Sequence, residues 1–174
     1  MKQMDALKVF RQLDRQGIYV LARADLEKLF PQEHEKAFEK SLQRLVSAGL
    51  LERVCKGVYL NPLARSKGAY VIEEIASVLR RGSLSYLSME SMLSEYDLIS
   101  QIPLRRITVM TTGAKGVVDT PYGSIEFTHT KRRATDIIRR SVALENRPLR
   151  IATEAAAVQD LRRVGRNTHM LRAV

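Results

Sequence analysis

The stretch LLERVCKGVYLNP, residues 50–62, contains two short apolar-rich runs at 51–54 and 58–60, joined by a Cys-Lys-Gly turn. Such runs on either side of a glycine predict a β-hairpin, because glycine readily adopts the positive φ that tight turns need. A helical run precedes the hairpin and ends at Gly49, in the position where glycine commonly terminates a helix. A helix, a glycine and a basic hairpin in this order are typical of a winged helix-turn-helix. We therefore predict such a domain over residues 1–62.

Two further helices are predicted before the one that leads into the hairpin. Apolar residues recur at helical spacing over residues 5–16 and 23–30. Pro31 ends the second of these helices, because the residue before a proline is pushed out of the helical region. Residues 18–21 form a short β-prone run that is expected to pair with the hairpin. The third helix is predicted over residues 33–48, and its buried stripe consists of Phe38, Leu42, Leu45 and Val46.

The opposite face of the third helix is basic. Lys36, Lys40 and Arg44 repeat every four residues and so line one edge. Pairing with Glu35 and Glu39 on an ordinary solvated surface is the simpler alternative, in which the domain has no nucleic-acid role. We favour double-stranded DNA as the partner, because this helix occupies the major groove in a helix-turn-helix. The predicted DNA-binding residues are Gln43 and Arg44, which read bases, and Lys36, Lys40, Ser47, Arg53 and Lys56, of which the lysines and the hairpin residues contact phosphate.

The composition of the 174-residue chain agrees with a polyanionic partner, since the net charge is +10. The single cysteine, Cys55, excludes an intrachain disulfide, and the neighbouring Lys56 is expected to lower the thiol pKa if the turn is exposed. His34, His129 and His169 lack ligand spacing, so neither a metal nor a cofactor is predicted. No signal peptide and no apolar run long enough to cross a bilayer are present in the sequence. We therefore expect a cytoplasmic protein with no membrane partner.

A polar stretch at residues 61–68, NPLARSKG, predicts a domain boundary. We place a linker at 63–67 and a second domain at 68–174. Residues 1–62 carry 11 lysine and arginine side chains against 8 acidic ones, whereas residues 63–174 carry 18 against 11. The second domain is therefore the more basic of the two, and the assignment of DNA binding to the first domain depends on topology rather than on charge.

The second domain is predicted to be a small mixed α/β structure, which makes the whole chain α+β. Glu154 and Asp160 lie six residues apart on its last helix and so on different faces, where capping and surface pairing account for both. The expected elements are a helix over 69–81, a helix over 89–96 capped by Ser88, a loop over 97–103, a strand over 107–112, a hairpin within 117–130, and a helix over 154–163 capped by Thr153.

Nine cations of the second domain have no helix-turn-helix to explain them. We hypothesise that they form one further surface, which contacts either the DNA backbone or an acidic partner protein. These residues are Arg80, Arg81, Arg105, Arg106, Lys131, Arg132, Arg133, Arg139 and Arg140.

Catalytic groups are sparse in this sequence. Asp119 and Glu126, on neighbouring predicted strands, resemble the carboxylates with which metal-dependent nucleases hold Mg²⁺. Such nucleases usually have a lysine two residues after the second carboxylate, where this chain has Thr128. We therefore predict a protein that is not an enzyme and has no catalytic residues, and a Mg²⁺-dependent cleavage assay tests the alternative.

Several stretches resemble AbiEi-type antitoxins of type IV toxin–antitoxin systems. They are the hairpin ending KGVYLNP, LSYLSMESMLSEYDLISQIP at 84–103, TVMTTGAKGVVDTPYGSIEFTHTKR from Thr108, and ATEAAAVQDL at 152–161. The resemblance implies that the first domain binds inverted repeats in its own promoter and represses it. It also implies that the second domain counteracts a nucleotidyltransferase-type toxin, and that more helix follows Leu161. The residues alone leave open an ordinary winged-helix transcription factor whose C-terminal domain dimerises or binds a small ligand.

Overall fold

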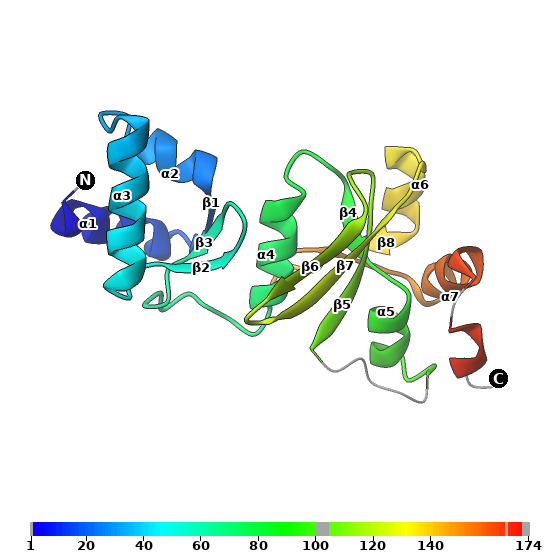
Figure 1. The fold of residues 1–174 in the computed structure, drawn as a ribbon. Helices are drawn as coiled ribbons and strands as arrows, with labels where there is room; N and C mark the ends of the chain where they lie inside the picture. Colours follow the sequence, from blue (N-terminus) through cyan, green and yellow to red (C-terminus); the bar gives the residue numbers. More distant parts are fainter. Residues whose placement is uncertain (1, 100–104, 166, 172–174) are drawn as a thin grey trace. The chain divides into compact units, whose positions relative to one another are not determined.

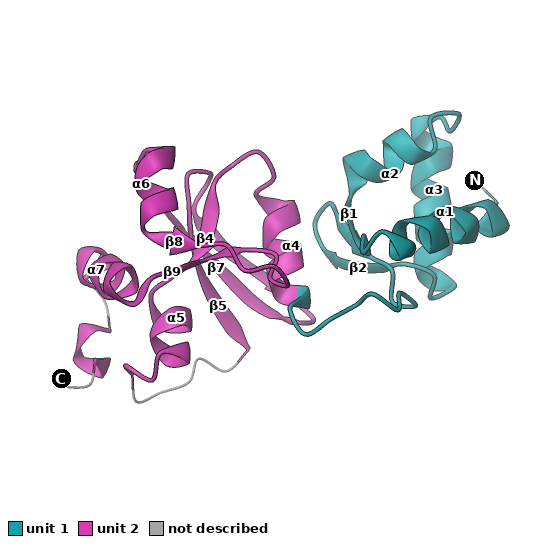
Figure 2. Cartoon of the chain, turned by 180° about the vertical axis from the view of Figure 1, so that it is seen from behind, with its two compact units in different colours: residues 1–71 teal, residues 72–174 magenta. Residues whose placement is uncertain are grey.

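The computed structural model describes residues 2–99, 105–165 and 167–171, which form two compact units (Figures 1 and 2). Unit 1 comprises Met1–Val71 and unit 2 comprises Ile72–Val174. The described residues form seven α-helices and two separate sheets, so the predicted α+β fold class is confirmed at this level.

Unit 1 consists of three helices and a three-stranded antiparallel sheet. The sheet has the order β1-β3-β2, in which Val20 and Glu52 both lie opposite Leu60. The β-prone run before the second helix therefore pairs with the hairpin, as expected. The elements in chain order are α1 (Gln3–Arg15), β1 (Val20–Ala22), α2 (Arg23–Leu29), α3 (Glu35–Ser47), β2 (Glu52–Cys55) and β3 (Val58–Leu60).

The core of unit 1 lies between the three helices and one face of the sheet. Phe38, Leu42 and Leu45 of α3 are buried in it, which confirms three members of the predicted stripe. The fourth, Val46, is 36% exposed, and Ser41 is buried in its place. Ser41 and Val46 flank the stripe on opposite sides at almost equal angles, so helical periodicity alone does not decide which of the two is buried.

The predicted linker at 63–67 is attached to unit 1. The backbone N–H groups of Arg65 and Ser66 donate to the Asp14 carboxylate of α1 at 3.0 and 2.9 Å, and the Ser66 hydroxyl donates to it at 2.7 Å. These hydrogen bonds, of which the one from the Ser66 hydroxyl contributes most, lower the pKa of Asp14. The division between the units falls a few residues later, at Val71.

Unit 2 is built on a mixed sheet with the order β6-β7-β5-β4-β9-β8. The pairs β5–β7 and β4–β9 are parallel, and the other three pairs are antiparallel. The elements are α4 (Val71–Leu79), β4 (Ser85–Leu87), α5 (Glu90–Glu95), β5 (Arg106–Thr111), β6 (Gly116–Thr120), β7 (Gly123–His129), α6 (Ala134–Arg139), β8 (Ser141–Val142), β9 (Arg150–Ala152), α7 (Glu154–Val164) and a short 3₁₀ helix (Thr168–Met170).

Helices cover both faces of this sheet, with α4 on one side and α5 and α7 on the other (Figure 1). The guanidinium of Arg80, just after α4, lies 3.9 Å from the ring centroid of Phe127 in β7. On the opposite face, Thr108 of β5 is hydrogen-bonded to Ser91 of α5. Strand alternation thus directs Thr108 and its neighbour Val109, which lies opposite Phe127, to different faces of the sheet.

The local elements of unit 2 were predicted better than its caps and shortest strands. Thr153 does cap α7, since its hydroxyl accepts from the N–H of Ala156. Ser88 does not cap α5, because the N-cap is Met89 at φ 52° and the Ser88 hydroxyl bonds elsewhere. Part of the loop predicted at 97–103 lies outside the described residues. The strands β4, β8 and β9 and the helix α6 were not predicted. Beyond Leu161, α7 continues to Val164 and a short 3₁₀ helix spans Thr168–Met170.

Gly123, at the start of β7, gives a test of this packing. Its φ is +131°, and a Cβ atom there would lie 2.4 Å from the backbone carbonyl oxygen of Arg105. Gly116 in the paired strand has a φ of +144° but nothing within 4 Å of the corresponding position. We expect Gly116→Ala to cost about 1–3 kcal/mol through backbone strain alone, and Gly123→Ala to cost clearly more. Urea unfolding of both variants measures the difference, and equal losses would contradict the close packing at Gly123.

Candidate nucleic-acid interface

The exposed face of α3 carries every helix residue that was predicted to contact DNA. Because Phe38, Leu42 and Leu45 turn into the core, the opposite side of the helix faces solvent. The side chains exposed there are Lys36, Lys40, Gln43, Arg44 and Ser47.

An ion pair between α2 and α3 decides which charges remain on this face. Arg23 of α2 lies 2.9 Å from Glu39 and 2.8 Å from Glu27. Glu39 is therefore paired with Arg23 rather than with the neighbouring lysines. Within the part of the chain that the structure describes, Lys36 and Lys40 form no ion pair, so their positive charge is available to an anionic partner.

Arg44 is held against the surface of α3 by a buried hydroxyl. Its Nη2 donates to Ser41 Oγ at 3.0 Å, and the Ser41 hydroxyl donates to an oxygen of Glu33 at 3.4 Å. Ser41 itself is almost fully buried. These groups surround a shallow hollow on α3 that is lined by Glu33, Ala37, Lys40, Ser41, Gln43 and Arg44.

The hairpin presents Arg53 and Lys56 to solvent, as predicted. Gly57 has a φ of +75°, the conformation that the turn requires. Its carbonyl oxygen accepts from the N–H of Arg23 at 2.8 Å, which ties the turn to the start of α2. The pKa of the Cys55 thiol, expected to be lowered by Lys56, is instead raised, because the side chain is half-buried; the nearby Arg53 opposes this effect only in part.

The nine cations of unit 2 do not form one surface, so that prediction is wrong. Arg105 and Arg106 lie at the start of β5. Residues 131–133 follow the end of β7, which runs parallel to β5, so the two groups lie at opposite ends of strands six or seven residues long. A six-residue strand is about 17–20 Å long. The positive charge is therefore divided between two ends of the sheet.

Several of these cations also bind within unit 2. Arg80 stacks on a phenylalanine ring and donates to the carbonyl of Ala114 at 2.9 Å, and its pKa is lowered by burial. Arg105 donates to the carbonyl of Pro121 at 2.7 Å, and Arg106 lies 3.7 Å from Glu126. The remaining side chains on the solvent side are Arg81, Lys131, Arg139 and Arg133, which makes an exposed ion pair with Asp136 at 3.5 Å.

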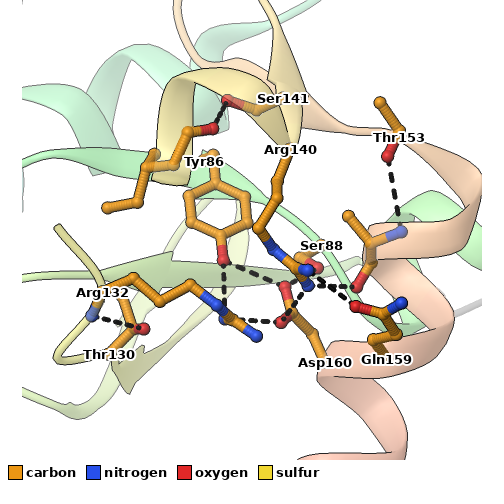
Figure 3. A network of polar contacts seen from close by, with 11 residues as sticks. Tyr86, Ser88, Thr130, Arg132, Arg140, Ser141, Thr153, Gln159 and Asp160 are labelled. Carbon is orange, nitrogen blue, oxygen red and sulfur yellow. Dashed lines mark hydrogen bonds and ion pairs between the residues drawn. The ribbon is translucent and has the colours of Figure 1, made fainter. Parts of the chain in front are cut away.

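Arg132 and Arg140 bind a buried carboxylate rather than a partner (Figure 3). Asp160 of α7 is fully buried and lies 2.7 Å from Arg132 and 3.2 Å from Arg140. It also accepts hydrogen bonds from the hydroxyls of Tyr86 at 3.0 Å and Ser88 at 2.8 Å. The predicted surface pairing of Asp160 is therefore wrong, and the network holds α7 to β4 and to the segments after β7 and α6.

Burial also affects the phenol at the centre of this network. The pKa of Tyr86 is raised to about 12, first by burial and then by the charge of Asp160. The sequence contained a signal for this arrangement. Asp160 falls on the helical stripe of Ala157, Leu161 and Val164, where an acidic residue is placed in the core and requires cationic or hydroxyl partners.

The carboxylates considered for a nuclease centre have partners of their own. Asp119 accepts a hydrogen bond from the Ser124 hydroxyl at 2.5 Å, and Glu126 faces Arg106. His129 Nδ1 lies 2.8 Å from the carbonyl oxygen of Gly113. Among residues 2–99, 105–165 and 167–171, no group of three or more histidine, cysteine or acidic side chains is placed to hold a metal ion. No helix in the same ranges has the length and apolar character needed to span a bilayer.

Comparison with known proteins shows a fold relationship. No protein-family model matches the chain, and no curated protein matches it either. The crystal structure of the RV2827C protein from Mycobacterium tuberculosis is similar, with a TM-score of 0.61 at 16% sequence identity. The match covers 91% of this chain and 60% of that protein, so the chain spans about 60% of the length of its structural neighbour. At this identity the similarity shows the fold alone.

The buried network of unit 2 can be tested with one matched pair of substitutions. Asp160→Asn keeps the shape of the side chain but leaves Arg132 and Arg140 without their counter-charge. We expect the free energy of unfolding to fall by at least about 2 kcal/mol. This loss is at the lower end of what breaking a buried ion pair costs, because both arginines remain partly exposed. Asp136→Asn removes the same charge from the exposed pair with Arg133 and should change stability by less than about 1 kcal/mol. Thermal and urea unfolding measure both, and similar losses would show that Asp160 is not an essential counter-ion.

Proposed function

We propose that unit 1 is a winged helix-turn-helix domain that binds double-stranded DNA, with α3 in the major groove and the β2–β3 hairpin as the wing. The order α1-β1-α2-α3-β2-β3 with a β1-β3-β2 sheet supports this assignment. The observation that carries it is the face of α3, where Lys36 and Lys40 are exposed and Glu39 is paired with Arg23. A surface that concentrates positive charge on one helix fits the phosphate backbone.

The contacts on this surface divide by chemistry. Phosphate is the expected ligand of the exposed cations on the edge of α3 and on the wing. These are Lys36, Lys40, Arg53 and Lys56. Gln43 and Arg44 have planar groups that can form paired hydrogen bonds with base edges, and Ser47 offers a hydroxyl at the end of the helix. In this proposal the lysines and the wing position the protein on the DNA backbone, and the middle of α3 recognises the base sequence.

We further propose that the protein is an antitoxin and autorepressor of the AbiEi type, acting in the cytoplasm without enzymatic activity of its own. In this proposal unit 1 binds inverted repeats in its own promoter. Unit 2 counteracts a nucleotidyltransferase-type toxin encoded next to it. The resemblance of residues 84–103, 108–132 and 152–161 supports the antitoxin role. The separate sheet and core of unit 2 are compatible with a role independent of DNA.

The wing can be tested through the salt dependence of DNA binding. If Lys56 meets a phosphate, Lys56→Ala should weaken binding to specific and random duplexes about equally. It should also reduce the slope of log affinity against log salt concentration by about 0.9. Fluorescence anisotropy over a salt series measures both quantities. Lys8→Ala on α1, which removes an exposed lysine outside the proposed surface, serves as the control. A changed sequence preference with an unchanged slope would instead assign base reading to the wing.

The antitoxin proposal predicts that the two activities separate. Full-length protein with Lys40→Ala and Arg44→Ala should lose promoter repression yet still restore growth to cells that express the neighbouring nucleotidyltransferase. The fragment 68–174 should behave in the same way. A promoter–reporter assay and growth curves measure the two outcomes. Loss of rescue in the folded double variant would contradict separate roles, and the absence of rescue by the intact chain would favour an ordinary transcription factor with a dimerising or ligand-binding C-terminal domain.

A further inference from the structure

The hollow on α3 places a cation and an anion side by side on the face that is proposed to meet the bases. Glu33, just before α3, and Arg44 of α3 both line it, together with Ala37, Lys40, Ser41 and Gln43. The Ser41 hydroxyl links the two charges, accepting from Arg44 at 3.0 Å and donating to Glu33 at 3.4 Å. The guanidinium of Arg44 and the carboxylate of Glu33 therefore both lie within hydrogen-bonding distance of the same hydroxyl.

We propose that this hollow binds the major-groove edge of a G·C base pair, with Arg44 on guanine and Glu33 on cytosine; the inference rests on the DNA-binding function proposed above. Guanine presents two adjacent acceptors, N7 and O6, and the cytosine N4 amine is a donor beside them. Arginine pairs with the first two atoms and a carboxylate accepts from the third. An A·T pair interleaves a donor between its acceptors and adds a methyl group, so it does not match this arrangement.

The carboxylate also explains why Arg44 should read a base rather than bind phosphate. An isolated arginine on α3 would attract any backbone phosphate, independently of sequence. Glu33 places a negative charge at the same hollow, and the repulsion between like charges disfavours a phosphate there. The hydrogen bond to Ser41 restricts the guanidinium before DNA arrives, which reduces the ordering required on binding. Glu33 and Ser41 thus make the hollow selective for a base edge.

The experiment selects preferred duplexes for the full-length protein from a randomised DNA library. The affinities are then measured for the selected duplex, for a version with G·C replaced by A·T at each conserved pair, and for a scrambled duplex. For the wild-type chain, we expect at least one invariant G·C pair whose replacement weakens binding about 10- to 100-fold. Arg44→Ala and Glu33→Gln should each lose the preference at that same pair.

Matched variants separate this reading from a general effect of charge. Glu35→Gln removes the same charge from an exposed residue in the first turn of α3 that does not line the hollow, and it should keep the G·C preference. Lys40→Ala should weaken all duplexes about equally, as expected for a phosphate contact. Glu33→Gln keeps the shape of the side chain, and circular dichroism verifies that each variant is folded.

The outcomes distinguish this inference from the proposed function. If Glu33→Gln and Arg44→Ala bind DNA with the wild-type base preference, the G·C hollow is wrong while DNA binding by unit 1 stands. A loss of preference in Glu35→Gln as large as that in Glu33→Gln would also overturn the inference, because net charge alone would then explain it. If the wild-type protein binds selected and scrambled duplexes equally, sequence-specific DNA binding fails, and the inference fails with it.

Discussion

The buried carboxylate of Asp160 is the constraint on which the architecture of unit 2 depends. A fully buried charge is stable in a protein only if cationic and hydrogen-bonding partners surround it. Here those partners come from β4, from the segment after β7 and from the end of α6, so one side chain of α7 connects three parts of the chain. Two arginines that were predicted to lie on a binding surface are thereby held, partly buried, against this carboxylate.

Unit 1 also contains an ion pair between helices, but this pair lies at the surface and affects which charges are exposed. Arg23 binds Glu39 near the exposed side of α3, so this carboxylate is not paired with the lysines beside it. Arg23 also donates its backbone N–H to Gly57 in the hairpin turn, so α2, α3 and the hairpin meet at one residue. The basic face of α3 therefore depends on a residue that is not itself part of that face.

Much of this fold could be predicted from the sequence, because turns, caps and helical spacing depend on residues close together in the chain. The hairpin around Gly57, the cap at Thr153, the helices α1 and α7 and three of the four predicted stripe residues of α3 all follow from short-range patterns. The sheet order of unit 2 does not, because it depends on pairing between segments far apart in the sequence. The strands β4, β8 and β9 were not predicted, since they are short and no hairpin turn marks them. Likewise Ser88 has the residue type of a helix cap, but the buried Asp160 competes for its hydroxyl. The exposed polar residues of α3 were predicted from the sequence, whereas the ion-pair partners of Glu39 and Asp160 became known only from the structure.

The distribution of partners within the protein changes what its net charge means. Unit 2 carries half of the net charge, 16 basic side chains against 11 acidic ones, yet Arg132 and Arg140 bind Asp160. Arg147 likewise binds Glu73 at 2.9 Å and Glu95 at 2.5 Å. Burial raises the pKa of Glu73 even beside this arginine. The pair is therefore part of the packing of unit 2 and adds little to the positive charge that a partner meets. The equal net charge of unit 1 includes exposed lysines on one helix. Because a polyanion responds to charge that it can approach, the argument for DNA binding rests on α3 and not on the total of +10.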